Sequence, residues 1–184
     1  MTGLNAENHM VAPRTGFENE IGVLSNLRGK PVFTPLYKPA DKTSIVRDLD
    51  LDFDASRILF TGYKGTNNLF GVYEISADFS KLAKEMPYQT PALVSPEDGK
   101  YDIQWWDGCY LPNKDQVILL GTAAYQFLPC EDGNMPMAVL YRKDRKTGEV
   151  RQLTYEQDSD YTPSITHDGR VLYTRWEYSD QPHY

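Results

Sequence analysis

The chain has 184 residues, of which 40% are hydrophobic and 24% charged, and its formal net charge is −7. This length allows one domain with a sizeable core. The acidic balance argues against a nucleic-acid partner, because phosphate binding depends on clustered Lys and Arg. We expect no membrane span either, because no run approaches the roughly 18 apolar residues that a transmembrane helix needs.

Residues 1–30 read as a polar N-terminal segment with little periodicity and one short strand near residues 21–24. Residues 1–16 show neither the basic n-region nor the apolar h-region of a secretory signal. From Pro31 onward, short apolar runs alternate with turn residues. Tyr, Phe and Trp make up 12% of the chain, which favours pleated, half-buried strands. Residues 80–86 alone look helical, and this run is too short to set the fold class.

Three segments share one pattern: a strand, a tight turn rich in Asp, Asn or Gly, and a second strand that opens with a polar residue. They are 48–61, the pair 101–104 and 109–120, and 160–174. We expect equivalent second strands at 58–61, 117–120 and 171–174.

Further strands follow in the same order. Residues 69–75 and 137–142 read as third strands, and residues 148–154 as a fourth, outer strand. The junctions match as well, because Leu93, Asp98 and Tyr101 stand about 60 residues before Leu153, Asp158 and Tyr161.

Four strands per unit, recurring at about 55–60 residues, are typical of β-propeller blades. We therefore predict an all-β fold, a β-propeller segment of about three four-stranded antiparallel blades within residues 31–184. The blades are expected at approximately 45–95, 98–155 and, incomplete, 158–184. The alternative is a sandwich of unrelated hairpins.

The segment Pro163–Tyr173 resembles the P-x-x-S-P-D-G-x-x-I-x-F box of TolB-type, WD-repeat-like propellers, with Thr166-His167 in place of Ser-Pro. Residues 152–158, 168–180 and 182–184 are similar to the propeller region of the hydrazine synthase alpha-subunit family. This resemblance implies one domain of a larger, secreted, haem-bearing polypeptide. Relatives continue past Pro182-His183-Tyr184, which implies that this chain is truncated.

Four aspartates, Asp48, Asp50, Asp52 and Asp54, alternate with Leu49, Leu51 and Phe53. Strand periodicity places the carboxylates on one face, which we expect to be solvated. An EF-hand loop is excluded, because Phe53 and Leu59 occupy the positions of its Gly and Glu. The alternative is a weak cation site formed with loops of another blade.

The two cysteines, Cys109 and Cys130, are too far apart for a C-x-x-C site, and no haem-attachment motif is present. We expect Cys109 in the core. Cys130 is the candidate metal ligand, which the hydrazine synthase resemblance favours, and a small buried side chain is the alternative. We expect no cofactor in this segment; haem could lie elsewhere in the parent protein.

Large aromatic side chains are the candidate binding surface, namely Trp105, Trp106 and Trp176. One of Trp105 and Trp106 is expected in the core and the other on a surface. No catalytic residues can be nominated, because serine elbows and glycine-rich phosphate loops are missing.

The sequence therefore predicts a non-catalytic propeller scaffold or binding module of a larger bacterial protein, periplasmic or extracellular. The alternative is a segment that shapes the active site of a haem-containing, hydrazine-synthase-like oxidoreductase. The expected partners are the rest of the parent polypeptide or another subunit. A partial propeller exposes apolar blade faces, so we expect either self-association, with two copies completing a six-unit ring, or marginal stability of the chain alone.

Overall fold

The computed structural model describes residues 18–40, 42, 44–64, 69–77, 88–97, 102–113, 115–128 and 135–177, and none of these is helical. Twelve strands form four antiparallel sheets. Two sheets have four strands and two have two. The strands are β1 (Ile21–Ser25), β2 (Val32–Tyr37), β3 (Val46–Leu51), β4 (Arg57–Lys64), β5 (Leu69–Ser76), β6 (Ala92–Leu93), β7 (Trp105–Tyr110), β8 (Gln116–Gly121), β9 (Val139–Asp144), β10 (Val150–Gln152), β11 (Asp160–Ile165) and β12 (Val171–Arg175).

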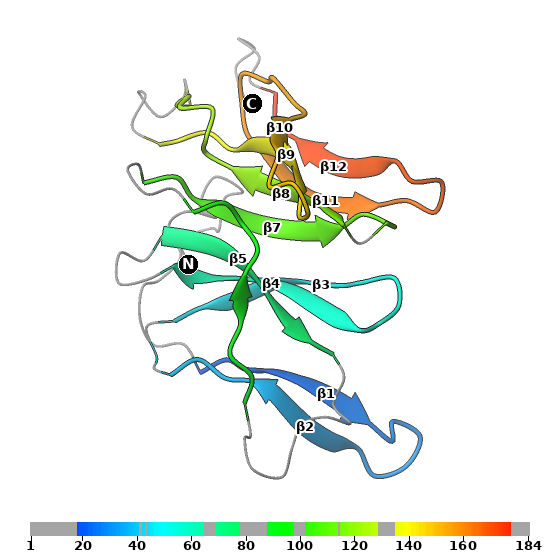
Figure 1. The fold of residues 1–184 in the computed structure, drawn as a ribbon. Helices are drawn as coiled ribbons and strands as arrows, with labels where there is room; N and C mark the ends of the chain where they lie inside the picture. The colour runs from blue at the N-terminus through cyan, green and yellow to red at the C-terminus, as the bar shows by residue number, and fades with distance from the viewer. Residues whose placement is uncertain are drawn as a thin grey trace, which may run out of the picture.

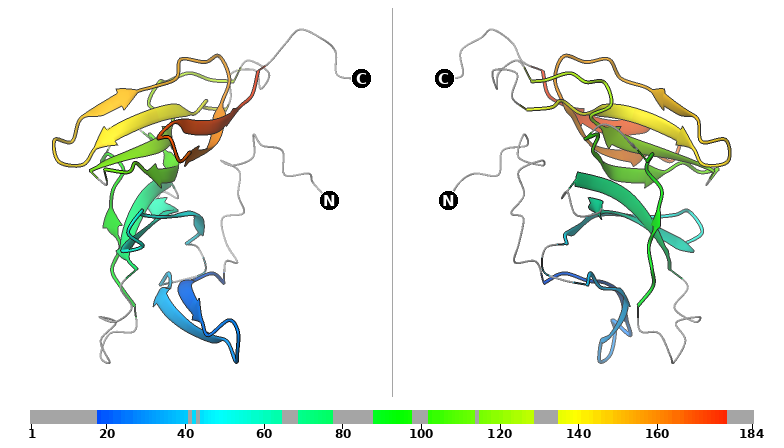
Figure 2. Two further views of the ribbon diagram at one scale, coloured as in Figure 1. Left: turned by 90° about the vertical axis from the view of Figure 1, so that its right-hand side faces the viewer. Right: turned by 60° about the vertical axis from the view of Figure 1, so that its left-hand side comes forward.

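The four sheets follow one another as a stack in chain order (Figure 1). The hairpin β1–β2 lies at one end, the sheets β3–β6 and β7–β10 in the middle, and the hairpin β11–β12 at the other end. Strands β3, β7 and β11 contact one another in that order, and we call them the inner strands. The outer strands β6 and β10 lie on the opposite side (Figure 2). Across the described residues, no helix has the length and apolar character that a membrane crossing requires.

The predicted strand order is confirmed. Strands β4, β8 and β12 contain the three expected second strands, and each pairs antiparallel with the inner strand before it. The expected third strands are β5 and β9, and the expected outer strand is β10. The strand near residues 21–24 is also present, as β1, but it is half of a hairpin with β2 rather than an isolated strand. The proposed helix at 80–86 lies outside the described residues.

The predicted match at the junctions is wrong. Tyr73 pairs with Leu93 in the first complete sheet, and Tyr141 pairs with Gln152 in the second, so Leu93 corresponds to Gln152 and not to Leu153. Pairing across the inner strands makes Trp106 the equivalent of Tyr161. The inner strand of the second sheet therefore begins after residues 102–104 and not at Tyr101. The two junctions contain similar residue types, but the strands do not pair in the register that this similarity suggested.

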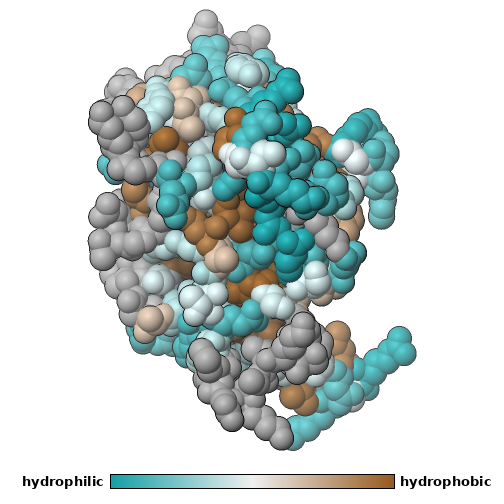
Figure 3. Space-filling view, in the orientation of Figure 1, coloured by the Kyte–Doolittle hydropathy of each residue, from teal (hydrophilic) through white to brown (hydrophobic). Residues whose placement is uncertain are grey.

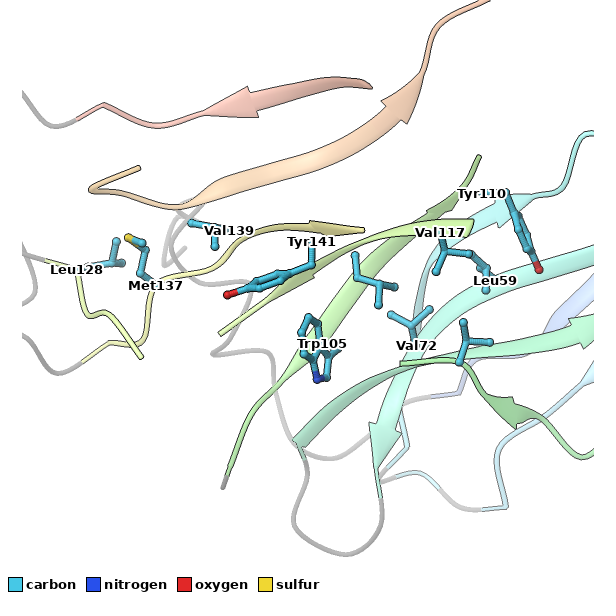
Figure 4. Close-up of a cluster of buried hydrophobic side chains, with 11 residues drawn as sticks. Leu59, Val72, Trp105, Tyr110, Val117, Leu128, Met137, Val139 and Tyr141 are labelled. Atoms are coloured by element: carbon cyan, nitrogen blue, oxygen red, sulfur yellow. The ribbon is translucent and has the colours of Figure 1, made fainter. Parts of the chain in front are cut away.

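Each complete sheet buries both of its faces. One face of β3–β6 carries Leu59 and Val72, which pack on Val117 and Tyr141 of the next sheet (Figure 4). Its other face carries Ile58, Phe60 and Ile75, which pack on Ile21 and Leu36 of the hairpin β1–β2. The sheet β7–β10 repeats this arrangement, because Ile118, Leu120 and Leu140 face β11–β12. Apolar side chains at both odd and even strand positions follow from this two-sided burial.

Gly121 provides a test of the packing between neighbouring strands. It lies opposite Trp105, and an added Cβ would lie 2.3 Å from the indole ring. Gly62 is the equivalent residue opposite Val46, and its Cβ would meet nothing closer than 3.4 Å. We expect Gly121→Ala to lower the free energy of unfolding by about 2–3 kcal/mol, because overpacking displaces the ring. Gly62→Ala should change it by less than about 1 kcal/mol.

Urea unfolding followed by tryptophan fluorescence measures both variants. Equal effects of the two substitutions would contradict the packing of Trp105 on Gly121.

Candidate functional site

Each inner strand is interrupted by a β-bulge at the same register. The bulges lie between Arg47 and Asp50 in β3, between Trp106 and Cys109 in β7, and between Tyr161 and Ser164 in β11. The residue that opens each bulge has a positive φ: 52° at Asp48, 49° at Asp107 and 46° at Thr162. A bulge re-aims side chains and leaves one backbone group out of the ladder. The three units therefore present a short polar side chain at equivalent points of the inner strands, and the N–H groups of Asp107 and Thr162 at these points bond outside their own sheet.

These freed groups join one unit to the next. The backbone N–H of Asp107 donates to Thr61 Oγ1 of the preceding sheet at 2.9 Å. The N–H of Thr162 in turn donates to Asp107 Oδ2 at 2.9 Å. Outside the bulge, the N–H of Tyr110 likewise donates to Asp50 Oδ2 at 2.8 Å. In every case the acceptor belongs to the earlier unit and the donor to the inner strand of the later one.

The carboxylates beside the bulges form an acidic group around Asp107. Burial, together with the nearby carboxylate of Asp48, raises the pKa of Asp107 to about 6, although the Thr162 N–H and Arg47 oppose the shift. Burial also raises the pKa of Asp50, against the hydrogen bond from Tyr110. Arg47 Nε donates to Asp48 Oδ2 at 2.8 Å. Such a group can accept hydrogen bonds and hold a proton near neutral pH. Among the described residues, no set of three His, Cys, Asp or Glu side chains is arranged to hold a metal ion.

The predicted solvated face of Asp48–Asp54 is wrong for Asp48, Asp50 and Asp52, whereas Asp54 is exposed as expected. Leu49, Leu51 and Phe53 are exposed as well, and Asp52 is only 3% exposed. Asp52 closes the β3–β4 turn, because its carboxylate accepts hydrogen bonds from the N–H groups of Ser56 and Arg57. Asp50 and Asp52 are not solvated because their carboxylates accept hydrogen bonds from backbone N–H groups, which strand alternation alone does not reveal.

The prediction that one of Trp105 and Trp106 lines a surface is also wrong, because both are 2% exposed. Strand β7 lies between β3–β5 on one side and β11 on the other, so both of its faces are covered. Trp105 packs edge-on against Tyr141 with ring centroids 5.1 Å apart, and Trp106 lies beside Phe70. Trp176 is half-buried against the same cluster as Trp105.

Cys109 is buried in β7, as predicted, and burial raises the pKa of its thiol. Cys130, the candidate metal ligand, lies outside the described residues.

A second polar cluster, which the sequence analysis missed, centres on Glu74. Its carboxylate accepts hydrogen bonds from the Tyr110 hydroxyl at 2.6 Å and from Arg145 Nη2 at 2.9 Å. The Arg57 guanidinium lies 3.5 Å from the same carboxylate and 5.4 Å from the centroid of the Tyr110 ring. Glu74 and Arg57 belong to the first complete sheet, and Tyr110 and Arg145 to the second. The partners are distant in sequence, so no local pattern could have indicated this link.

Comparison with known structures places this arrangement in a fold. The chain is similar to TolB from Acinetobacter baumannii, with a TM-score of 0.53 and 16% identity over 88% of this chain and 34% of that one. It is also similar to hydrazine synthase from Kuenenia stuttgartiensis, with a TM-score of 0.49 and 13% identity over 70% of this chain and 21% of that one. The chain matches no protein-family model, and a search of curated proteins found no relative by sequence.

At this identity the TolB likeness shows the fold. The chain is an all-β propeller segment, and the expected similarity to TolB-type propellers is confirmed. It spans about a third of the TolB chain, at 34%.

The raised pKa of Asp107 predicts a pH-dependent stability. The folded state binds this proton more tightly than the unfolded chain, since the pKa rises from 3.8 to about 6. The stabilisation is therefore complete below about pH 4 and is lost as pH rises toward 6, by at most about 3 kcal/mol. Asp107→Asn keeps an oxygen for the Thr162 N–H and carries no charge. We expect this variant to be more stable than the wild type at pH 7.5, but not at pH 4.

Urea titrations at the two pH values measure this difference, with Asp102→Asn at an exposed position as the control. The same pH dependence in the wild type and in Asp107→Asn would place the proton elsewhere.

The Glu74 cluster predicts an unequal response of two Glu–Arg pairs. We expect Glu74→Gln to lower the free energy of unfolding by about 2 kcal/mol, because Tyr110, Arg57 and Arg145 lose their shared anion. The matched change Glu149→Gln removes the charge of an exposed partner of Arg142, 3.9 Å away, and should cost less than about 0.5 kcal/mol. Thermal unfolding at low and high salt compares the two. Similar losses would show that Glu74 contributes no more than a surface charge.

Proposed function

We propose that this chain is a β-propeller scaffold and binding module, without catalysis of its own, in a larger extracytoplasmic bacterial protein. The observation that supports this most directly is the use of its polar side chains. Asp50, Asp107 and Glu74 are half-buried groups of the kind that active sites employ. Each of them accepts a hydrogen bond from the following unit, so each holds the stack together.

The propeller fold supports the same proposal. Propeller units stack around an axis and leave the loops at their ends free to carry recognition. The chain covers a minor part of TolB, at 34%, so a larger polypeptide could supply the remaining units. We propose that the rest of such a polypeptide, or another subunit, is the partner. The periplasmic or extracellular location is part of the proposal and follows from the family resemblance in the sequence.

The test uses the complete reading frame that contains this sequence, expressed in its bacterial host. Osmotic shock, with a periplasmic enzyme and a cytoplasmic enzyme as markers, locates the product, and haem staining after denaturing electrophoresis detects covalent haem. We expect the protein in the periplasmic fraction or the medium, without haem. Recovery with the cytoplasmic marker would contradict the location. Covalent haem would favour the alternative, an oxidoreductase whose active site this segment shapes.

A further inference from the structure

The position that an indole ring fills in the second complete sheet is left open in the first. Pairing in the two ladders makes Val46 the equivalent of Trp105 and Gly62 the equivalent of Gly121. The indole of Trp105 covers Gly121, and Trp105 is only 2% exposed. Val46 is half-buried, and the atom nearest to a Cβ added at Gly62 is 3.4 Å away. A short aliphatic side chain therefore stands where the next sheet carries a ring.

A hollow of about 130 Å³ lies beside Gly62, where the sheet β3–β6 meets the end of the hairpin β1–β2. Its lining includes four aromatic side chains, namely Tyr37, Phe60, Tyr63 and Tyr73. An apolar cavity of about 150 Å³ in a protein interior takes up benzene, so a hollow of this size accommodates an aromatic ring. Figure 3 shows hydrophobic residues at several places on one face of the molecule, between hydrophilic ones, so exposure alone marks no site.

The rings that line the hollow are held by contacts with one another. The ring centroids of Tyr37 and Phe60 lie 5.1 Å apart, and those of Phe60 and Tyr73 lie 5.8 Å apart. The Tyr73 hydroxyl donates to the carbonyl oxygen of Tyr63 at 3.1 Å. Tyr63 in turn stacks on Phe70 with a centroid distance of 5.2 Å. Walls that are already ordered lose little conformational entropy when a ligand binds.

The second complete sheet shows how a ring is held at this position. Tyr141 packs edge-on against the indole of Trp105, with the ring centroids 5.1 Å apart (Figure 4). Such edge-to-face pairs are favourable because the positive edge of one ring meets the negative face of the other. Tyr73 is the equivalent of Tyr141 and lines the hollow. Burial and nearby Tyr37 raise the pKa of the Tyr73 hydroxyl, so this wall carries no charge at neutral pH.

We propose that the hollow beside Gly62 binds a small planar aromatic molecule of about the size of indole, in the place that the Trp105 side chain fills one sheet later. The ring would lie on Gly62 and pack against Tyr73, as the indole does on the equivalent residues. The carbonyl oxygen of Ile45, which lies 3.5 Å from a Cβ added at Gly62, borders the hollow as an acceptor for a ring N–H or O–H. This site goes beyond the proposed scaffold role, because it gives the module a ligand of its own.

Equilibrium dialysis against radiolabelled indole, with the protein purified from the complete reading frame, tests the proposal. We expect a bound indole that two variants lose. Val46→Trp puts the indole of a side chain into the hollow, and Gly62→Ala adds a methyl group to its wall. Each should weaken indole binding by at least about tenfold. Phe53→Trp introduces the same side chain at a position that is 57% exposed, and should bind indole as the wild type does. Circular dichroism checks that the variants fold, and Gly62→Ala decides alone if Val46→Trp does not.

Two competing ligands test the chemical class. Phenol and cyclohexanol share a ring size and a hydroxyl and differ in aromaticity, so phenol should displace the bound indole and cyclohexanol should not. Equal displacement by both would show that the hollow selects for size, and would overturn the proposal. A wild type that takes up no indole, because the hollow is too narrow or another segment of the polypeptide fills it, would also overturn it, as would undiminished binding in Gly62→Ala. None of these outcomes alters the fractionation and haem results that test the proposed function.

Discussion

Every sheet in this chain has two apolar faces, and the rest of the structure depends on covering both. A sheet of two or four short strands cannot bury two faces alone, so each unit depends on its neighbours for stability. Leu59 and Ile118 become fully buried because another sheet lies on them, whereas Leu172, at the same register, is exposed because none of the described sheets covers it. The fold is therefore a stack of sheets in which the two complete sheets are covered by neighbours on both faces.

Polar groups follow from the same constraint. A bulge at the inner strand frees a backbone N–H next to the adjoining sheet, where water is excluded, and a buried N–H without a partner is costly. The preceding unit supplies the partner from Thr61 or Asp107, and Asp50 does the same for the Tyr110 N–H beyond the bulge. In the third inner strand the bulge also accommodates Pro163, which has no N–H for the ladder. Carboxylates that resemble a reactive group in isolation are, in this arrangement, connectors between sheets.

Sequence reasoning recovered the parts of the fold that depend on local patterns. Strands such as β4, β8 and β12 combine an apolar run with a turn of Asp, Asn or Gly before it, and both signals are local. It failed where contacts with the neighbouring unit determine whether a side chain is buried. Alternation alone could not reveal that Asp50 accepts the Tyr110 N–H of the next unit, or that β11 covers Trp106. The Glu74 cluster joins residues up to 71 positions apart, and only the three-dimensional arrangement brings them together.

The pair Trp105–Gly121 has a consequence for how this repeat changes over evolution. The same cross-strand position holds Val46 with Gly62 in the first complete sheet and Asp160 with Arg175 in the last hairpin. One geometry thus accepts an aliphatic, an aromatic and a charged combination, provided that the two partners fit each other. Substitutions at these sites should therefore occur as compensating pairs, so that a large residue on one strand accompanies a small one opposite. Alignments that score each column separately lose this information, and the ancestry of such units is better traced through covariation across the ladder than through residue identity.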